Sequence, residues 1–144
     1  MPVFHYMSDT YAVAPQITLE DVEALAAEGF RTIVCNRPDE EVPADICAEA
    51  VKAECERAGL NFILNPLSHG TLNMDHVNLQ RQATEAEAPV LAYCASGNRC
   101  SILWGLAVVG DVSTDHILEV TTKAGYNLTG LVPQLEEMAK SRNS

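Results

Sequence analysis

Positively charged residues are scarce in this chain of 144 residues. Nine Lys and Arg stand against 20 Asp and Glu, which gives a formal net charge of −11 and a pI near 4.6. Binding to a nucleic-acid backbone needs clustered Lys and Arg, so we expect no nucleic-acid partner. A small anionic substrate would have to be held by local groups, because the field of the whole protein repels it.

Long apolar runs and targeting signals are also missing. No run approaches the length of about 20 residues that a membrane span requires, so no membrane association is expected. The first ten residues, MPVFHYMSDT, lack the basic segment and apolar core of a secretory signal. The sequence therefore predicts a soluble cytoplasmic protein, if the chain starts at its natural end. Its length fits a single domain over residues 1–144.

Metal-ligand and disulfide patterns are absent from the five cysteines and four histidines. No two cysteines form a CxxC pair, and no histidine lies at ligand spacing from them. An odd number of cysteines in a cytoplasmic chain argues against a disulfide framework. We expect no metal, no cofactor and reduced thiols.

The most informative stretch runs from Pro89 to Leu106. The apolar run PVLAY ends at Cys94, the polar loop CASGNR covers residues 94–99, and the apolar helical pattern CSILWGL begins at once. A loop between a strand end and a helix N-terminus gathers N–H groups and the positive end of the helix dipole, which makes an anion site. A thiol placed there ionises below the free value of about 8.5, so Cys94 is the candidate nucleophile.

The other residues of this cysteine loop (residues 94–99) have supporting roles. Gly97 permits a positive φ or close backbone approach. Arg99 carries a planar fork that suits two oxygens of an oxyanion. The remaining loop residues that we expect to border the anion are Ala95, Ser96, Asn98 and the adjacent Cys100. The alternative is that Cys94 is an inert cysteine packed in the core.

Strand and helix patterns alternate along the chain. They predict an α/β fold with a mostly parallel central sheet of four to five strands, helices on both faces and Cys94 at a strand's carboxyl end. Residues 8–16 read as a turn region. The expected strands cover residues 3–7, 32–35, 62–64 and 89–93, and the expected helices cover 18–29, 43–58, 73–86, 99–109, 114–123 and 131–138.

Two other loops supply candidate accessory groups. The run NRPDEE at 36–41 follows a predicted strand, so Arg37 and Asp39 could border the site, or could belong to a solvated loop. Residues 65–73 contain no Asp or Glu, and His69 is the one titratable group there. Asp39 and His69 are therefore the possible proton donors, with a surface role as the alternative for each.

Four segments resemble the phosphatase-like domain family of bacterial beta-lactamase-hydrolase-like proteins, some members of which are also called sulfur transferases. They are SDTYAVAPQIT at 8–18, AAEGFRTIVCNRPDEE at 26–41, PVLAYCASGNR at 89–99 and AGYNL at 124–128. The resemblance implies a cysteine-phosphatase-like fold, related to tyrosine and dual-specificity phosphatases. Four residues separate Cys94 from Arg99, where such phosphatases have five, and the shorter loop is similar to that of rhodaneses.

The resemblance, with this short loop, favours sulfur transfer. The Cys94 thiolate would take sulfane sulfur from thiosulfate or a persulfide, and the Cys94 persulfide would pass it to a thiol acceptor. Some relatives carry a unit that looks like a persulfide oxidase, which implies such an enzyme as a partner in trans. One alternative is a phosphatase that forms a phosphocysteine at Cys94, with Asp39 or His69 as acid. A second is a non-catalytic anion or redox sensor that uses Cys94 and Cys100.

This chain departs from that family at two positions. Ala95 stands where members often have Arg, which removes a positive charge. Cys100 stands where members have Ser, which removes a hydroxyl near the thiolate and adds a second sulfur. A disulfide between Cys94 and Cys100 would need Cα atoms within about 7 Å, and a packing role is the alternative for Cys100.

Overall fold

The central feature of the computed structural model, which describes residues 3–68 and 70–143, is a twisted sheet. Within these residues the sheet has five strands in the order β1-β2-β5-β3-β4. Only the pair β1 and β2 is antiparallel. The strands are β1 (His5–Ser8), β2 (Tyr11–Ala14), β3 (Thr32–Cys35), β4 (Asn61–Leu64) and β5 (Val90–Tyr93). The expected α/β fold with a mostly parallel sheet is confirmed.

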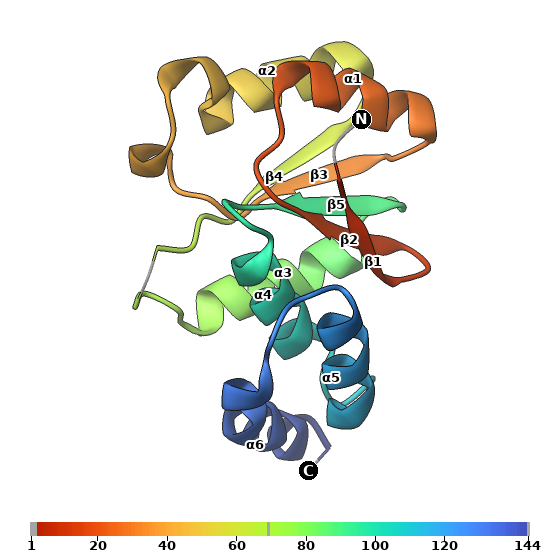
Figure 1. Ribbon diagram of the computed structural model, residues 1–144, viewed down its shortest axis with the longest axis vertical. Coiled ribbons are helices and arrows are strands. Elements are labelled where there is room, and N and C mark those ends of the chain that lie inside the picture. The colour runs from red at the N-terminus through yellow and green to blue at the C-terminus, as the bar shows by residue number, and fades with distance from the viewer. Residues whose placement is uncertain (1–2, 69, 144) are drawn as a thin grey trace.

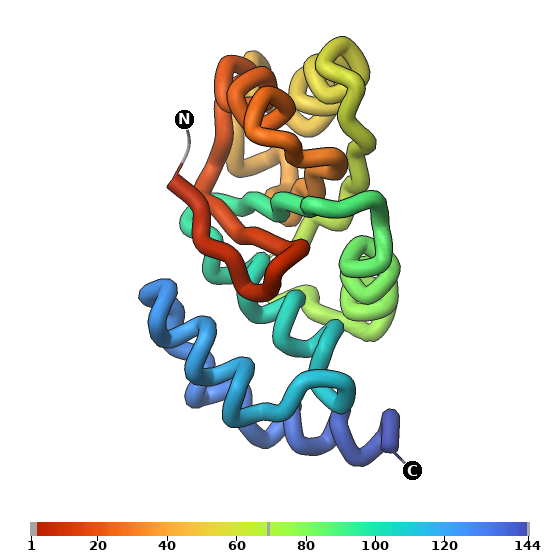
Figure 2. Tube along the Cα trace, turned by 90° about the vertical axis from the view of Figure 1, so that its right-hand side faces the viewer, coloured from red at the N-terminus to blue at the C-terminus, as the bar shows by residue number. Residues whose placement is uncertain are grey.

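Helices cover both faces of the sheet. Figure 1 shows α1 (Leu19–Glu28) and α2 (Ala48–Ala58) above it, and α3 (Met74–Thr84) and α4 (Asn98–Val108) below it. The last two helices, α5 (Thr114–Lys123) and α6 (Val132–Asn143), pack side by side beyond α4 (Figure 2). Successive strand residues face opposite sides, so Val13 and Ala92 join the core on the α4 side while Leu91 joins the core under α1.

Side-chain caps begin three of the helices as the sequence indicated. Thr18 and Asp21 form a reciprocal capping box at the start of α1. The Asn73 side chain accepts the His76 N–H at the start of α3, and the Ser113 side chain accepts the His116 N–H at the start of α5. These polar residues satisfy N–H groups that the first helical turn leaves without partners.

Two expected segments differ from the structure. The turn region at 8–16 contains β2, whose four residues are all buried because β2 pairs with β1 on one side and β5 on the other. The helix expected from Pro43 begins only at Ala48, after two 3-10 turns at Asp39–Glu41 and Ala44–Ile46. Asp39 accepts the Ala48 N–H at 2.8 Å and so stabilises this later start.

Arginine side chains hold the carboxyl end of α4. Arg142 Nη1, on α6, donates to the carbonyl oxygens of Leu106 and Val109 at 2.6 and 2.9 Å. Arg81, on α3, donates to the carbonyl of Ala107. Cationic donors at a helix C-terminus satisfy its last carbonyls and interact favourably with its dipole. The helix that follows the cysteine loop is thus anchored at its far end. No helix in residues 3–68 and 70–143 is both long and apolar enough to cross a bilayer.

Candidate active site

The cysteine loop joins the carboxyl end of β5 to the start of α4. The pairing of β2 with β5 continues one residue beyond the strand, where Cys94 N–H donates to Ala14 O at 3.3 Å. Gly97 precedes the first residue of α4 and has φ of 95°, a left-handed conformation that glycine adopts without steric cost. The expected strand, tight loop and helix start are therefore present at the expected positions.

The carbonyl groups of the loop point away from its centre. Ala95 O accepts the backbone N–H of Gln16 at 3.3 Å, and Ser96 O accepts the hydroxyl of Tyr126 at 3.0 Å. Gly97 O accepts both the N–H and the hydroxyl of Ser101. Because these oxygens are bonded outside the loop, the peptide N–H groups are turned inward, which is the arrangement that binds anions.

The Cys94 sulfur lies at the centre of this ring of donors. Gly97 N–H donates to Cys94 Sγ at 3.0 Å. A hydrogen bond from the Cys100 thiol is the main cause that lowers the pKa of Cys94 to about 5, and the N–H groups of Cys100, Gly97 and Ser96 lower it further, against the opposing effect of burial. Cys94 is therefore a thiolate at neutral pH, the nucleophilic form of the residue.

Cys100 occupies the first turn of α4 directly behind the nucleophile. It is fully buried, and this burial together with the nearby Cys94 thiolate raises the pKa of its thiol well above the usual value. The pKa values of the two neighbouring thiols are thus shifted in opposite directions, which favours the thiolate at Cys94 and the protonated thiol at Cys100. All five cysteines are free thiols.

Arg99 is held in place by the carboxylate of Glu41, which was not among the expected site residues. Its Nη1 and Nη2 atoms donate to the two oxygens of Glu41 at 3.0 and 2.7 Å, and Nη1 also donates to Leu67 O. Only 9% of the Arg99 side chain is exposed. Among the described residues, Nε of Arg99 has no hydrogen-bond partner, so this edge of the guanidinium can still donate, as the predicted role in oxyanion binding requires.

Glu41 is shared by two arginines. Arg37 Nε donates to the Glu41 carboxylate at 3.3 Å, and its other nitrogens donate to Glu41 O and to the Gln16 side chain. The hydrogen bond from Arg99, followed by the contribution of Arg37, lowers the pKa of Glu41. A loop arginine that must be buried needs such a partner, and the run of three acids at 39–41 was the signal that could have pointed to it.

A buried polar cluster supports the loops that surround Arg99. The side-chain amides of Asn36 and Asn65 both donate to Gln80 Oε1 on α3, at 3.0 and 2.8 Å. Asn36 follows β3 and Asn65 follows β4, so the cluster ties two strand ends to the helix beneath them. Asn36 O also accepts the Leu67 N–H, which places the Leu67 carbonyl for its bond to Arg99. No motif in the sequence indicated this cluster.

The other expected site residues lie at the rim or outside the described residues. Ala95, Ser96 and Asn98 are exposed at the loop surface. Asp39 lines a pocket of about 290 Å³ together with Arg37, but its carboxylate also binds the start of α2. His69, the other candidate proton donor, lies outside the described residues.

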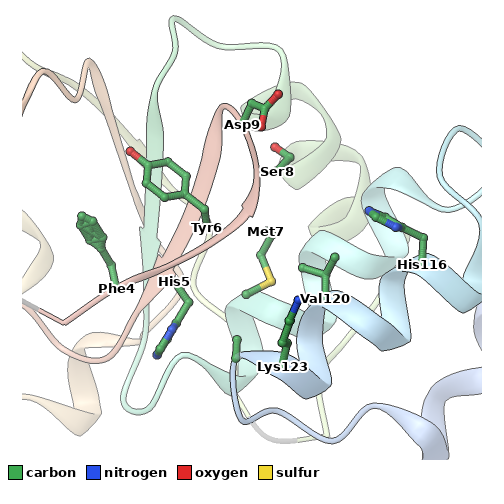
Figure 3. Close-up of a pocket in the computed structure, with 10 residues that line it drawn as sticks. Phe4, His5, Tyr6, Met7, Ser8, Asp9, His116, Val120 and Lys123 are labelled. Atoms are coloured by element: carbon green, nitrogen blue, oxygen red, sulfur yellow. The ribbon is translucent and has the colours of Figure 1, made fainter.

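A second pocket, of about 550 Å³, lies between β1 and α5 and does not include Cys94 (Figure 3). His5 from β1 and Lys123 from α5 are among its lining residues. The His5 ring packs edge-on against Tyr126, with 6.3 Å between ring centroids. Tyr126 thus contacts both a residue that lines this pocket, His5, and the cysteine loop, at Ser96 O.

Comparisons with known proteins give matches over most of the chain. Residues 3–111 match the family described as "Beta-lactamase hydrolase-like protein, phosphatase-like domain". The chain is 28% identical over 136 residues to the beta-lactamase hydrolase-like protein of Agrobacterium fabrum, a match that covers 92% of this chain and 32% of that protein. The chain therefore spans about a third of the length of the curated relatives it matches.

Solved structures show the same fold. A Neisseria meningitidis protein, described only provisionally as a phosphatase, is 33% identical with a TM-score of 0.79, covering 93% of this chain and 96% of that one. A structure of PTPMT1 in complex with PI(5)P has a TM-score of 0.78 over 98% of this chain and 99% of that one. At 14% identity this second likeness concerns the fold alone.

Proposed function

Because the chain belongs to the phosphatase-like domain family of beta-lactamase hydrolase-like proteins, we propose that it is a cysteine-dependent phosphatase that cleaves small phosphate monoesters. The observation that carries the proposal is the Cys94 thiolate at the centre of a ring of N–H donors, close enough to Arg99 to interact with its charge. We treat residues 1–144 as one catalytic domain. The free thiols suit a reducing compartment such as the cytoplasm.

The reaction proceeds in two displacement steps. The Cys94 thiolate attacks phosphorus, the bond to the ester oxygen breaks, and the alkoxide or phenoxide leaves with a proton from solvent or an acid. Water then attacks the phosphocysteine, and phosphate and the thiolate are released. The loop N–H groups and Arg99 bind the non-bridging oxygens through both steps, and the Cys100 thiol stabilises the departing thiolate.

Intact-protein mass spectrometry after brief exposure to a phosphate ester tests this proposal. The wild type is expected to gain a phosphoryl group of about 80 mass units and to release phosphate steadily, whereas Cys94→Ser shows neither. A second sample of the same protein is exposed to thiosulfate, and its mass change is compared with the change caused by the phosphate ester. A gain of about 32 mass units that cyanide removes, without phosphate release, would instead establish sulfur transfer.

Sulfur transfer is the second candidate because only four residues separate Cys94 from Arg99. The donor would be thiosulfate or a persulfide, and the Cys94 persulfide would be discharged by a thiol acceptor. A persulfide-oxidising enzyme acting in trans would then be the partner. Retained anion binding without either reaction would favour the third candidate, a sensor of anions or of redox state.

Turnover is expected to depend steeply on the leaving group. Glu41 is held ionised by two arginines, and Asp39 binds the start of α2, so neither is a ready proton donor. A general acid contributes a factor of about 10² to 10⁴, so an aryl phosphate should have a kcat/KM at least about 100-fold above that of an alkyl phosphate. A series of esters with rising alcohol pKa measures this dependence.

A flat dependence on the alcohol pKa would contradict this prediction and would show that an acid operates. Asp39→Asn and His69→Ala would then identify the donor, because the variant that loses it regains the steep dependence.

A further inference from the structure

One peptide group of the cysteine loop is held at both of its ends. The peptide that joins Ser96 to Gly97 presents its carbonyl to the Tyr126 hydroxyl at 3.0 Å. Its N–H donates to Cys94 Sγ, also at 3.0 Å. If this peptide turned over, its carbonyl oxygen rather than its N–H would face the sulfur, and the anion site would lose a donor and gain a repulsive oxygen.

The Ser96 carbonyl differs from its neighbours in how it is held. Ala95 O is bonded by a backbone N–H of the β2–α1 connection, and Gly97 O by donors of Ser101 within α4. The partner of Ser96 O is a side chain 30 residues away, in the segment between α5 and α6. Tyr126 belongs to the segment AGYNL at 124–128.

The fit between Tyr126 and the loop is close. A Cβ atom added to Gly97 would lie 2.2 Å from the Tyr126 hydroxyl oxygen and 2.9 Å from Cζ, closer than real Cβ atoms approach other atoms. The tyrosine ring also makes an edge-on contact with the His5 ring. The Tyr126 hydroxyl group therefore lies directly against the Ser96–Gly97 peptide and has little room to move closer to Gly97.

We propose that Tyr126 is a positioning residue, whose hydroxyl keeps the Ser96–Gly97 peptide turned with its N–H toward Cys94 and toward the bound anion. The part of this inference that concerns substrate rests on the proposed function. The part that concerns the thiolate is independent of that function, because the Gly97 N–H donates to Cys94 Sγ when no substrate is bound.

Tyr126→Phe tests the proposal because it removes a single oxygen atom and keeps the ring. The rate of Cys94 alkylation by iodoacetamide, followed against pH, reports the pKa of the thiol. A neutral hydrogen bond is worth about a factor of 3 to 10, so the pKa of Cys94 should rise by about half a unit to one unit. Protection of Cys94 by inorganic phosphate should weaken by about 3- to 10-fold. The melting temperature should change little.

Tyr6→Phe is the matched control, since Tyr6 is an exposed tyrosine of β1. It should leave both readouts unchanged. Tyr126→Phe with an unaltered Cys94 pKa and unaltered phosphate protection would overturn the proposal. Faster alkylation at an unchanged pKa would also overturn it, because Tyr126 would then act as a cover over the loop. Neither measurement needs turnover, so failure of the phosphatase proposal would be seen separately, as absence of phosphate release.

Discussion

Replacing Glu41 by Gln is expected to lower kcat/KM for a phosphate ester by about 100-fold. Glu41 holds the end of the Arg99 fork with two hydrogen bonds, which aims the remaining edge at the anion. A displacement of about 1 Å in a positioned group costs about 10² in rate. A neutral amide has one acceptor atom in place of two, so it cannot keep this geometry. Steady-state kinetics with an aryl phosphate measures the loss.

The same substitution is expected to destabilise the protein in a pH-dependent way. Breaking charge-assisted bonds to a buried arginine costs about 1.5 kcal/mol or more. Because Arg99 and Arg37 lower the pKa of Glu41, its contribution is fully present above the ordinary value of about 4.5 and is lost as the pH falls through the lower folded value. Urea unfolding of wild type and Glu41→Gln should therefore differ at pH 7 and converge in strong acid.

Glu40→Gln removes the same charge from an exposed neighbour and is the control for both measurements. It should leave kcat/KM within about twofold of wild type and should change stability by less than about 0.5 kcal/mol. An increase in activity on Glu41→Gln would contradict the argument, because it would mean that Glu41 withholds Arg99 from the substrate.

Replacing Cys100 by Ala is expected to make Cys94 a much weaker acid. The Cys100 thiol is the main cause that lowers the pKa of Cys94 to about 5, so removing it should raise that pKa by more than one unit. At pH 5.5 the alkylation rate of Cys94 should then fall by about threefold or more, since the thiolate is the reacting form. Cys100→Ser keeps a donor and should stay closer to wild type.

Cys47→Ala is the control for Cys100→Ala, because Cys47 lies before α2, in a different part of the chain. It should leave the alkylation profile of Cys94 unchanged. The lowered pKa of Cys94 also stabilises the folded protein. This contribution is fully present above the pKa of a free thiol and is lost as the pH falls toward about 5. An unchanged profile in Cys100→Ala would show that the loop N–H groups alone ionise the sulfur.

Local sequence signals were sufficient for most of the fold. Helix caps such as Thr18 and Asn73 act within a single turn, so they could be recognised from neighbouring residues. The buried run at Thr32–Cys35 and the apolar stretch before Cys94 were likewise predicted as strands. The strand β2 was missed because YAVA is short, rich in alanine and flanked by turn residues, and its burial comes from the strands on either side.

The candidate site could be predicted only where its residues are adjacent in the chain. The cysteine loop places Cys94, Gly97 and Arg99 within six positions, and the structure brings them together as expected; their catalytic roles stay predictions. Glu41 and Tyr126 contact the loop from 58 and 30 residues away. The acidic run at 39–41 indicates that a carboxylate is available as a partner for an arginine, but neither it nor the segment AGYNL indicates which side chain reaches the loop, because that depends on how α2 and α5 pack.

The anchoring of α4 by Arg142 also determines where a tethered domain would start. A chain that continued after Asn143 would leave the molecule at the carboxyl end of α4, whose 11 residues rise about 16 Å away from the nucleophile. A flexible linker of about ten residues has an average end-to-end distance of roughly 18 Å, which matches this separation. An acceptor domain fused at that end would therefore meet Cys94 most often with a linker of about this length, and less often with one that is much shorter or longer.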